Sequence, residues 1–516
     1  MSSLHTLGRW TADRALSTPE RTAIDDRGVP LSYRDLENRS TALAGALKDA
    51  GYRRGDRIAT VTGNSADHVV AFFACAKAGL VLVPLSWRLS ARELAAQLAL
   101  ADPALLLVEE EFSAVAMEAA ARLAVPPPSA GLGRTGVESG PPAPARLLEE
   151  TGSTGDTVLD DDPLLMVFTS GTEADPKAVV LSHANCFWTN LSLSRTAEIG
   201  SRDVVLSVLP QFHAGGWNIQ PLLAWWTGAT VVLERTFDAG RVLALIEDRK
   251  VTTMMGVPAH YLMLAAHPRF QGTDLSSLGR AVVGGASMPA PLLRTWHARG
   301  VALAQGYGLS EAGPNVLCLP EEEAGARIGM AGKPYPHVDV AVADPVTGEQ
   351  LDGPGTGELL VSGPGVFAGY FRDPEATAAA LAGGWLRTGD LVERDADGYL
   401  RVIDRLKDIY ISGGENVSPA EVEAVLLEHP AVAEAAVAGD VENGLVGVSK
   451  LAADGRAQHA DQDIYQPIAP ISSHNQPCQP SRQGAQNKPK KNIHFFSPPF
   501  TSSSYDGNEK KVFSKS

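Results

Sequence analysis

The segment from residue 31 to residue 108 alternates between patterns typical of helices and patterns typical of strands. One helix is expected to begin after Ser32, whose hydroxyl can cap the backbone at Asp35, and to end near Gly51. The strands and helices expected next are residues 57–61, 65–78, 80–84, 91–101 and 104–108. Such alternation predicts a parallel sheet with right-handed crossovers, and ligands of such sheets bind beyond the carboxyl ends of the strands.

A later apolar segment, residues 164–168, predicts a buried strand that leads into a loop of small polar residues. The loop residues are Thr169, Ser170, Gly171 and Thr172. Hydroxyls and backbone N–H groups around a glycine can bind phosphate, and Lys177 can add a positive charge. The loop is not a Walker A motif, because Pro176 precedes the lysine and Ala178 follows it. An ordinary surface loop with a solvated lysine is the alternative.

The segment from Thr169 to Lys177 resembles the signature of the AMP-forming acyl-CoA synthetases, whose superfamily includes peptide-synthetase adenylation domains and firefly luciferase. Six further motifs match in order: Pro210–Gly216, Gly284–Ala286, Tyr307–Glu311, Thr388–Asp390, Arg405–Asp408 and Gly413–Asn416. The resemblance covers about residues 8–439. Ala174 and Ala178 stand where the family usually has glycine, which would stiffen the loop because glycine alone tolerates positive φ freely.

The resemblance implies a binding site for ATP. The positions that it assigns to the nucleotide are Thr169, Ser170, Gly171, Thr172, Lys177, Gly284, Gly285, Ala286, Tyr307, Gly308, Ser310, Asp390 and Arg405. In the family, the residue at Tyr307 stacks on adenine and the one at Ser310 lies near the α-phosphate. The residue at Asp390 accepts hydrogen bonds from the ribose hydroxyls, a role that suits a carboxylate. The glycine turn at 284–285, taken alone, is equally typical of an ordinary turn.

The catalytic positions implied by the resemblance are Thr172, Lys177, His213 and Glu311. Thr172 and Glu311 would hold Mg²⁺, and one carboxylate is enough because phosphates and waters complete the shell of a hard cation. A solvated glutamate at a helix start is the alternative for Glu311. His213 would orient the reacting carboxylate or gate access to it, although a lone histidine on an apolar background is more often a boundary residue.

The second half of the reaction is expected to involve coenzyme A. Gly413 and Gly414 would line the pantetheine tunnel, and Lys407 stands at the family's hinge, about which the small C-terminal domain rotates. Before the hinge, residues 357–404 contain short strand patterns separated by glycines, which predict a β-rich subdomain. After it, a helix from Ser418 to Leu427 and a strand at 432–437 begin the small domain.

The end of the chain departs from the family. Residues 441–516 are rich in Gln, Asn, Ser and Pro and contain nine Lys/Arg against six Asp/Glu. No Pro-x-x-x-x-Gly-Lys motif, whose lysine reaches the carboxylate and α-phosphate in the family, is present there. This composition predicts a disordered replacement of the family's usual end, and impaired adenylation; a docking arm is the alternative.

The expected architecture is α/β. A large N-terminal domain, residues 1–404, would hold parallel and mixed sheets flanked by helices, the β-rich subdomain and a Pro-rich surface linker at 125–162. Residues 405–440 would begin a small, truncated α+β domain, and 441–516 would form the tail.

Composition limits the location and the partners. The net charge of -16 argues against nucleic-acid binding. No signal-peptide pattern is read at the N-terminus, and the apolar stretch 68–85 is broken by Lys77 and Gly79, so no membrane span is expected. The cysteines lie far apart, which favours neither disulfides nor zinc and fits the cytoplasm. They are Cys75, Cys186, Cys318 and Cys478.

These observations predict a ligase that joins a small carboxylic acid to CoA, first forming an acyl adenylate with release of pyrophosphate. Candidate acyl-pocket residues, which could equally be core, are Trp217, Asn218, Trp225, Val257, Pro258 and Tyr261. They are mostly apolar and offer no cation for a second carboxylate, so fatty or aryl acids are favoured over dicarboxylic acids. The alternatives are an adenylation domain that serves a carrier protein and a nucleotide- or acyl-binding pseudoenzyme. The sequence leaves the oligomeric state open.

Overall fold

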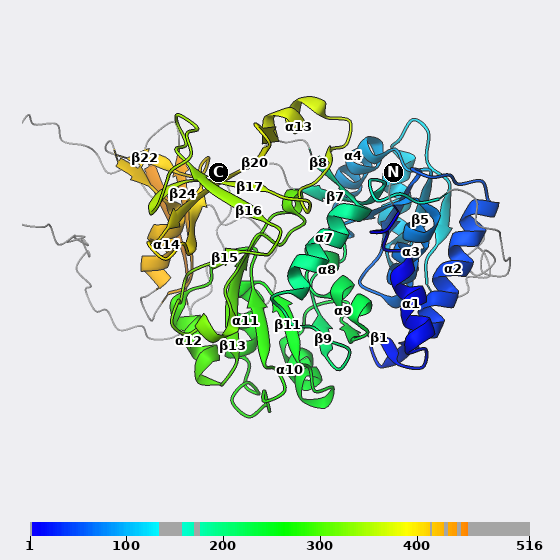
Figure 1. Ribbon diagram of the computed structural model, residues 1–516, viewed down its shortest axis with the longest axis horizontal. Coiled ribbons are helices and arrows are strands. Elements are labelled where there is room, and N and C mark those ends of the chain that lie inside the picture. The colour runs from blue at the N-terminus through cyan, green and yellow to red at the C-terminus, as the bar shows by residue number, and fades with distance from the viewer. Residues whose placement is uncertain are drawn as a thin grey trace, which may run out of the picture. The chain divides into compact units, whose positions relative to one another are not determined.

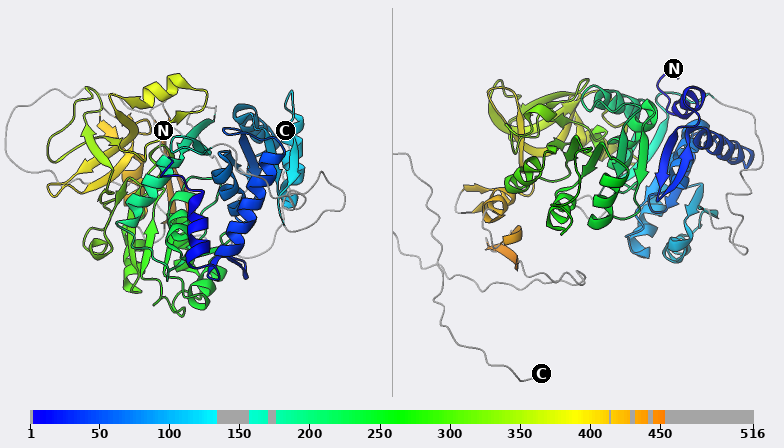
Figure 2. Two further views of the ribbon diagram at one scale, coloured as in Figure 1. Left: turned by 45° about the vertical axis from the view of Figure 1, so that its right-hand side comes forward. Right: turned by 90° about the horizontal axis from the view of Figure 1, so that it is seen from below.

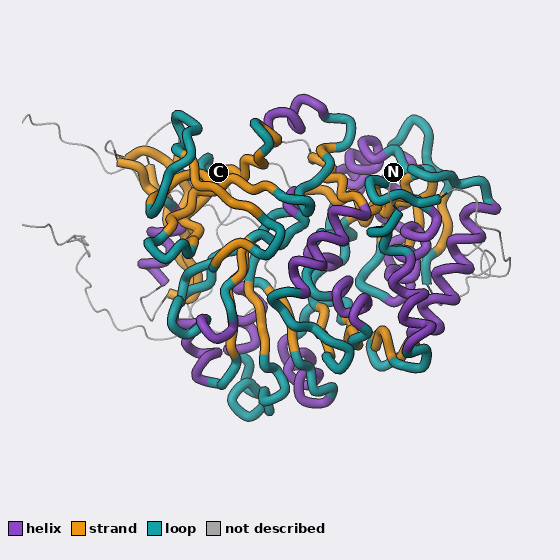
Figure 3. The backbone as a smooth tube through the Cα atoms, viewed as in Figure 1, coloured by secondary structure: helices purple, strands orange, loops and turns teal. Residues whose placement is uncertain are grey.

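Helices flank sheets of strands in the part of the chain that the structure, a computed structural model, describes (Figure 3). The described residues are 3–133, 157–169, 176–412, 415–427, 432–440 and 445–452. The arrangement confirms the predicted α/β class with a β-rich subdomain. No helix among these residues has both the length and the apolar character needed to cross a membrane.

The first sheet combines the parallel strands predicted between residues 57 and 108 with strands from later in the chain. In spatial order its seven strands are β18 (Gly369–Tyr370), β8 (Lys177–Ser182), β7 (Pro163–Thr169), β4 (Val81–Leu85), β3 (Arg57–Val61), β5 (Leu105–Val108) and β6 (Ser129–Gly131). The strands from β7 to β6 pair in parallel, as the alternation predicted. Strand β8 returns antiparallel to β7, so Lys177 lies directly across from Thr169.

The first part of the chain contains the three helices that the sequence predicted and several that it did not. They are α1 (Arg9–Ser17), α2 (Tyr33–Asp49), α3 (Ala66–Ala78), α4 (Ala91–Ala101), the short η1 (Glu110–Phe112), α5 (Ser113–Ala121) and α7 (His183–Ser194). The predicted helices are α2, α3 and α4. Ser32 and Asp35 form the predicted capping box at the start of α2. Figures 1 and 2 show α1 and α2 side by side in the N-terminal part of the chain.

Part of the predicted surface linker at 125–162 belongs to the sheet. Strand β6 pairs with β5, and Ala130 and Leu132 are buried. At its other end, Asp162 is buried and pairs with Arg54. Residues 134–156 of the linker lie outside the described part of the chain. The predicted linker therefore does not include residues 129–132 or Asp162. For residues 134–156 it stays a prediction.

The second sheet carries the strands of the middle of the chain. Its nine strands are, in spatial order, β15 (Lys333–Pro334), β14 (Leu317–Cys318), β13 (Ala302–Tyr307), β12 (Arg280–Val283), β11 (Thr253–Gly256), β9 (Val204–Ser207), β10 (Thr230–Leu233), β1 (Thr22–Asp26) and β2 (Val29–Ser32). Its helical segments are α8 (Gly215–Asn218), α9 (Pro221–Thr227), α10 (Ala239–Asp248), α11 (Pro258–Ala266), α12 (Ala290–Ala298), η2 (Ser310–Ala312) and η3 (Glu321–Glu323). Strands β13, β12, β11, β9, β10 and β1 are parallel, so their carboxyl ends share one edge.

The predicted β-rich subdomain forms a third sheet. Its strands are β16 (Asp339–Ala343), β17 (Gly355–Ser362), β20 (Trp385–Arg394), β19 (Leu381–Ala382) and β21 (Leu400–Arg405), with helix α13 (Pro374–Ala380). Strand β18 lies between β17 and β20 in the sequence but is not part of the third sheet. It pairs with β8 of the first sheet, which places Tyr370 beside Val179.

The C-terminal part of the described chain contains two antiparallel strand pairs and a helix. They are β22 (Tyr410–Ser412) with β23 (Glu415–Val417), α14 (Pro419–Leu427), and β24 (Val432–Asp440) with β25 (Leu445–Ala452). Strand β25 lies within residues 441–516, which the sequence analysis assigned to a disordered tail. That prediction was wrong for this strand, because its apolar residues do not alternate regularly. The rest of the tail, 453–516, lies outside the described residues. Asp404 accepts hydrogen bonds from the Ser418 hydroxyl and the Ala420 N–H at the start of α14.

His183 is a buried histidine that ties the N-terminal segment to α7. Its Nδ1 accepts a hydrogen bond from the Leu7 N–H at 3.1 Å, and its Nε2 has no hydrogen-bond partner among the described residues. Burial lowers the pKa of His183 to about 4, against the opposing effect of Asp162 and Asp160. The folded state therefore holds this imidazole neutral.

We expect this histidine to make the fold sensitive to mild acid. The unfolded chain takes up a proton near pH 6.5 while folded His183 does not, so the free energy of unfolding should fall by up to about 3 kcal/mol between pH 6.5 and 4. His183→Asn should remove its own share of this slope and leave the share of buried His68, whose pKa burial also lowers to about 4. His337→Asn, at an exposed position, should keep the whole slope. Urea unfolding at a series of pH values tests this. An unchanged slope in His183→Asn would contradict the assignment.

Candidate active site

A cavity of about 740 Å³ lies where the carboxyl ends of strands from the first and second sheets meet. Its walls come from the segments that follow β7, β9, β11, β12 and β13. This position follows the general rule for ligand sites of parallel sheets.

The cavity brings together most of the predicted site residues. Those that line it are Thr169, Lys177, His213, Gly284, Gly285, Tyr307, Gly308, Ser310, Glu311 and Arg405, together with the hinge residue Lys407. Ala286 is not among the lining residues of the described chain, and Asp390 lies behind Tyr307. Ser170, Gly171, Thr172, Gly413 and Gly414 fall outside the described residues, so their predicted roles stay predictions.

Tyr307, Asp390 and Arg405 form one polar group at the wall of the cavity. The Tyr307 hydroxyl donates a hydrogen bond to Asp390, and Arg405 Nε lies 3.3 Å from the Asp390 carboxylate. Burial raises the pKa of Asp390, although Tyr307 and Arg405 oppose this effect. Burial and the adjacent carboxylate raise the pKa of Tyr307 well above its usual value. The tyrosine therefore stays protonated and occupies one acceptor oxygen of Asp390.

Tyr370 is a cavity residue that the sequence analysis did not select. Its hydroxyl donates to Glu311 Oε1 at 2.9 Å, and Lys177 Nζ lies 5.5 Å from the centre of its ring. Burial and the Glu311 carboxylate raise its pKa. The ring thus connects a predicted cation and a predicted metal ligand. No local sequence pattern predicted that Tyr370 would line the cavity, because only the pairing of β18 with β8 places it there.

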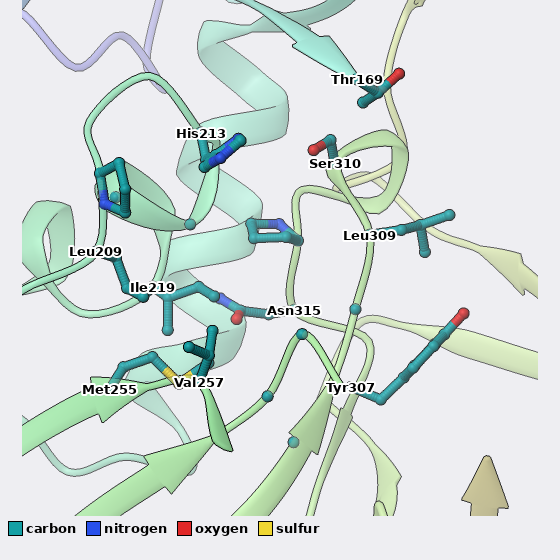
Figure 4. A pocket seen from close by; sticks show the side chains of 18 of the residues that line it. Thr169, Leu209, His213, Ile219, Met255, Val257, Tyr307, Leu309, Ser310 and Asn315 are labelled. Carbon is teal, nitrogen blue, oxygen red and sulfur yellow. The ribbon is translucent and has the colours of Figure 1, made fainter. Parts of the chain in front are cut away.

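His213 lies in the turn that follows β9, and its ring faces the cavity (Figure 4). Hydrogen bonds from Asn64 hold this turn: its Nδ2 donates to the Leu209 carbonyl at 2.9 Å and its Oδ1 accepts from the Gln211 N–H at 2.9 Å. Burial and the nearby Arg88 guanidinium lower the pKa of His213. The imidazole is therefore neutral at physiological pH, which suits a group that orients a ligand.

Glycines let the backbone come close at the rim of the cavity. A Cβ on Gly308 would lie 1.4 Å from the Pro314 carbonyl oxygen, and one on Gly216 would lie 2.3 Å from the Pro210 carbonyl oxygen. Gly285 has φ +81°. A side chain at Gly308 or Gly216 would force the backbone to shift, and one at Gly285 would be strained by the positive φ, which explains the glycines of these motifs.

One end of the cavity is apolar. In the view of Figure 4 the side chains of Leu209, Ile219, Met255 and Val257 gather there, across from Thr169, Ser310 and Tyr307. Of the six predicted acyl-pocket residues only Val257 lines the cavity. The prediction was wrong for Trp217, Asn218, Trp225 and Tyr261, which are fully buried core residues, and Pro258 begins α11 away from the lining.

The cavity also contains cations that the acyl-pocket prediction did not foresee. Arg235 is neutralised by Glu109 and Glu111, each at 2.6 Å. Arg88 packs over the rings of Trp87 and Phe212 and makes no ion pair within the described chain. Arg88 is therefore an uncompensated positive charge on the cavity wall.

Comparison with known proteins identifies the chain's relatives. The AMP-binding enzyme family matches residues 11–371. The chain belongs to this family. A feruloyl-CoA synthase from Amycolatopsis is 40% identical over 88% of this chain and 90% of its own length. An indoleacetate–CoA ligase from Aromatoleum aromaticum is 37% identical, over 84% and 85%.

Solved structures agree with this assignment. An O-succinylbenzoate–CoA synthetase from Bacillus subtilis, in complex with ATP and magnesium ion, superimposes with a TM-score of 0.76 at 30% identity and covers 87% of this chain and 90% of that one. The AMP-binding enzyme described here is thus an AMP-forming acyl-CoA synthetase, an ATP-dependent ligase of acyl or aryl acids that uses ATP, Mg²⁺ and CoA.

The residues present fit such ligands. Glu311 offers a cavity-lining carboxylate, and Lys177 and Arg405 offer positive charge for phosphate. No group of three or more His, Cys, Asp or Glu in the described chain is placed to hold a metal by itself. The single cavity-lining carboxylate of Glu311 fits Mg²⁺, which keeps phosphate and water oxygens in its shell.

We expect the cavity rim to reject a methyl group at position 308. Gly308→Ala would place Cβ against the Pro314 carbonyl, so it should lower the free energy of unfolding by about 1–3 kcal/mol and abolish measurable ATP binding. Gly279→Ala is the matched control, because its Cβ would meet nothing within 4 Å. Calorimetric ATP titration and thermal melting test both variants. Normal ATP affinity in Gly308→Ala would show that this contact does not shape the site.

Proposed function

We propose that this synthetase activates an apolar monocarboxylic acid, aryl or fatty, as its acyl adenylate and transfers the acyl group to CoA. The observation that carries the proposal is that one cavity joins a polar end, with Lys177, Glu311 and the Tyr307–Asp390 pair, to an apolar end. The polar end suits a nucleotide and the apolar end suits the acid's carbon skeleton.

The nucleotide roles carried over from the family are supported by position. Gly284, Gly285 and Tyr307 all line the cavity. Adenine could therefore stack on the Tyr307 ring and lie against the backbone of the two glycines. Asp390 would accept the ribose hydroxyls, and because Tyr307 already donates to it, a ribose must share or displace that hydrogen bond. Arg405, 3.3 Å from Asp390, would contact both ribose and phosphate.

Glu311, with Thr172, which lies outside the described residues, would hold Mg²⁺ at the phosphates. When bound, the ion would neutralise charge on the phosphate oxygens during displacement at the α-phosphate. Tyr370 holds the Glu311 carboxylate through its hydroxyl, so it restricts where that ligand can point. Lys177 would supply a point charge to the same phosphates.

His213 would orient the acid. Its ring is neutral and faces the cavity between the polar and apolar ends, so it can donate or accept one hydrogen bond without adding charge. Arg88, with no partner carboxylate in the described chain, would bind an anionic part of the acceptor, and the phosphates of CoA offer such a part.

The first half-reaction is proposed to be slow in the chain as printed. No Pro-x-x-x-x-Gly-Lys motif occurs in residues 441–516. Loss of one preorganised donor to developing negative charge typically costs about 2.7–4 kcal/mol, or roughly a hundred- to a thousandfold in rate. A pseudoenzyme that binds ATP and makes no adenylate is the alternative that this absence favours.

We also propose a cytoplasmic location. The described cysteines, Cys75, Cys186 and Cys318, are free thiols, which fits a reducing compartment.

The phosphate roles predict selective losses. Lys177→Ala and Glu311→Gln should weaken Mg·ATP-dependent pyrophosphate exchange by about tenfold or more, because both would act on phosphate charge. Melting should stay near wild type, because both residues line the cavity and are only partly buried. Lys250→Ala, an exposed lysine away from the cavity, is the control. Exchange at the wild-type rate in both variants would remove these residues from the site. No exchange in the wild-type protein would favour the pseudoenzyme.

The tail prediction is tested by deletion. Removing residues 453–516, which keeps the β24–β25 pair, should leave ATP affinity and the rate of pyrophosphate formation unchanged, because no lysine in the family's motif is lost. Calorimetry and a pyrophosphate assay with hexanoate compare the two chains. Fast adenylation by the full chain that disappears on deletion would show that a lysine of the tail replaces the missing one.

A further inference from the structure

Lys177 and Glu311 carry opposite charges at the polar end of the cavity. Both are partly buried, both line the cavity, and neither forms an ion pair within the part of the chain that the structure describes. Opposite charges that share a small, partly buried space attract each other more strongly than they do in water. An empty site of this kind would therefore favour a lysine–glutamate pair, in which each charge neutralises the other.

Tyr370 gives each of these charges a different partner. Its hydroxyl donates a hydrogen bond to Glu311 Oε1 at 2.9 Å, and Lys177 Nζ lies over its ring, 5.5 Å from the ring centre. A hydrogen bond from a neutral hydroxyl and a cation–π contact stabilise charges without cancelling them. The carboxylate and the ammonium thus keep their full charge.

The position of the tyrosine follows from the pairing of β18 with β8. Tyr370 lies opposite Val179, and Lys177 precedes Val179 by two residues on β8. Because alternate residues of a strand point to the same side, Lys177 and Tyr370 are diagonal neighbours on one face of the strand pair. Their contact is therefore set by the backbone of the two strands.

Further contacts fix the segment that carries Tyr370. Its backbone N–H donates to Thr377 Oγ1 at 2.9 Å, and its ring packs edge-on against Phe367, with the ring centroids 4.9 Å apart. The Phe367 N–H in turn donates to the Glu311 carbonyl at 2.8 Å. The tyrosine and the backbone of its carboxylate partner therefore belong to one connected unit.

A tyrosine that does not line the cavity shows that an aromatic ring alone does not keep charges apart. The Tyr399 hydroxyl donates to Glu323, and the Arg327 guanidinium lies 3.6 Å from the centre of its ring. There, however, Arg327 Nε contacts Glu323 Oε2 directly at 3.1 Å. The separation of Lys177 from Glu311 is therefore particular to the cavity.

We propose that Tyr370 is a positioning residue that keeps Lys177 and Glu311 apart in the empty site, so that both charges are available when Mg·ATP binds. This inference rests on the proposed function, which assigns Lys177 to the phosphates and Glu311 to Mg²⁺. Without the tyrosine, the lysine turns to the carboxylate, and the nucleotide must break that pair before it can bind either group.

Stability measurements without any ligand test the proposal. In the wild-type chain, the losses of melting temperature caused by Lys177→Met and by Glu311→Gln should add in the double variant, because the two side chains do not interact. In the Tyr370→Leu background, the double variant should melt above the sum of the single losses, because either substitution alone already removes the new pair. Additivity in both backgrounds, or the same coupling in both, would overturn the proposal.

Two further variants check this result. Tyr370→Phe keeps the ring and removes only the hydroxyl, so the coupling between Lys177 and Glu311 should be smaller than in Tyr370→Leu and of the same sign. If Tyr370→Leu does not fold, additivity in the Tyr370→Phe background overturns the proposal. Tyr399→Phe is the matched control, because it also removes a hydroxyl that binds a carboxylate. Coupling in this control would show that the effect does not depend on Tyr370.

Calorimetric titration with ATP in the absence of Mg²⁺ gives a second readout. Tyr370→Leu should weaken ATP binding by about two- to fivefold, the usual worth of an ion pair in a partly exposed site, because the pair must open. Adding Glu311→Gln frees the lysine, so it should raise the ATP affinity more in the Tyr370→Leu background than in the wild-type chain. Equal gains in the two backgrounds would contradict the inference.

Failure of the proposed function gives a different result. A wild-type chain that binds no ATP would overturn the assignment of both charges to the nucleotide. The stability measurements need no ligand, so they would still decide whether Tyr370 keeps Lys177 and Glu311 apart.

Discussion

The hydrogen bonds of one buried asparagine join the two large sheets at the cavity. Asn64 follows β3 of the first sheet, and its Nδ2 donates to the Leu209 and Glu234 carbonyls, which follow β9 and β10 of the second sheet. Its Oδ1 accepts from the Gln211 N–H. Each buried group left without a partner would cost about 1–3 kcal/mol, so the asparagine fixes how the strand ends of the two sheets face each other. The turn that presents His213 depends on this joint.

The polar end of the cavity is held by pairs that come from different sheets. Tyr307 of β13 binds Asp390 of β20, and Tyr370 of β18 binds Glu311 of η2. In both pairs a tyrosine hydroxyl donates to a carboxylate that the family assigns to a ligand. Each hydrogen bond restricts the directions in which its carboxylate can point, so these side chains are partly ordered before any ligand binds.

The apolar end of the cavity is shaped by which side chains pack into the core beside it. Trp217 and Trp225 are fully buried in the core, where the ring centroids of Trp217 and Phe72 lie 4.6 Å apart in a stacked arrangement. The cavity wall at this end is left to aliphatic residues such as Ile219 and Val257. The form of the apolar end therefore depends on packing in the adjoining core.

The sequence alone determined the elements and the family. Local patterns predicted the capping box at Ser32 and the parallel strands β3, β4 and β5, because caps and apolar periodicity act over a few residues. The motifs placed Lys177, His213, Tyr307 and Glu311 in one site, since each follows or begins a strand whose end must face the same edge. Strands β25 and β6 were missed, because each lies in a segment whose overall composition indicated a tail or a linker and is defined by its pairing partner.

Only the tertiary structure decided which side chains reach the cavity. Tyr370 lines the cavity because β18 pairs with β8, which is far away in the sequence. Trp217 and Tyr261 do not line it, because their side chains are fully buried in the core. Arg88 lines it without a carboxylate partner among the described residues, which no local pattern could indicate. The direction of a side chain depends on packing between distant segments, whereas the existence of a helix or a strand depends mainly on its own residues.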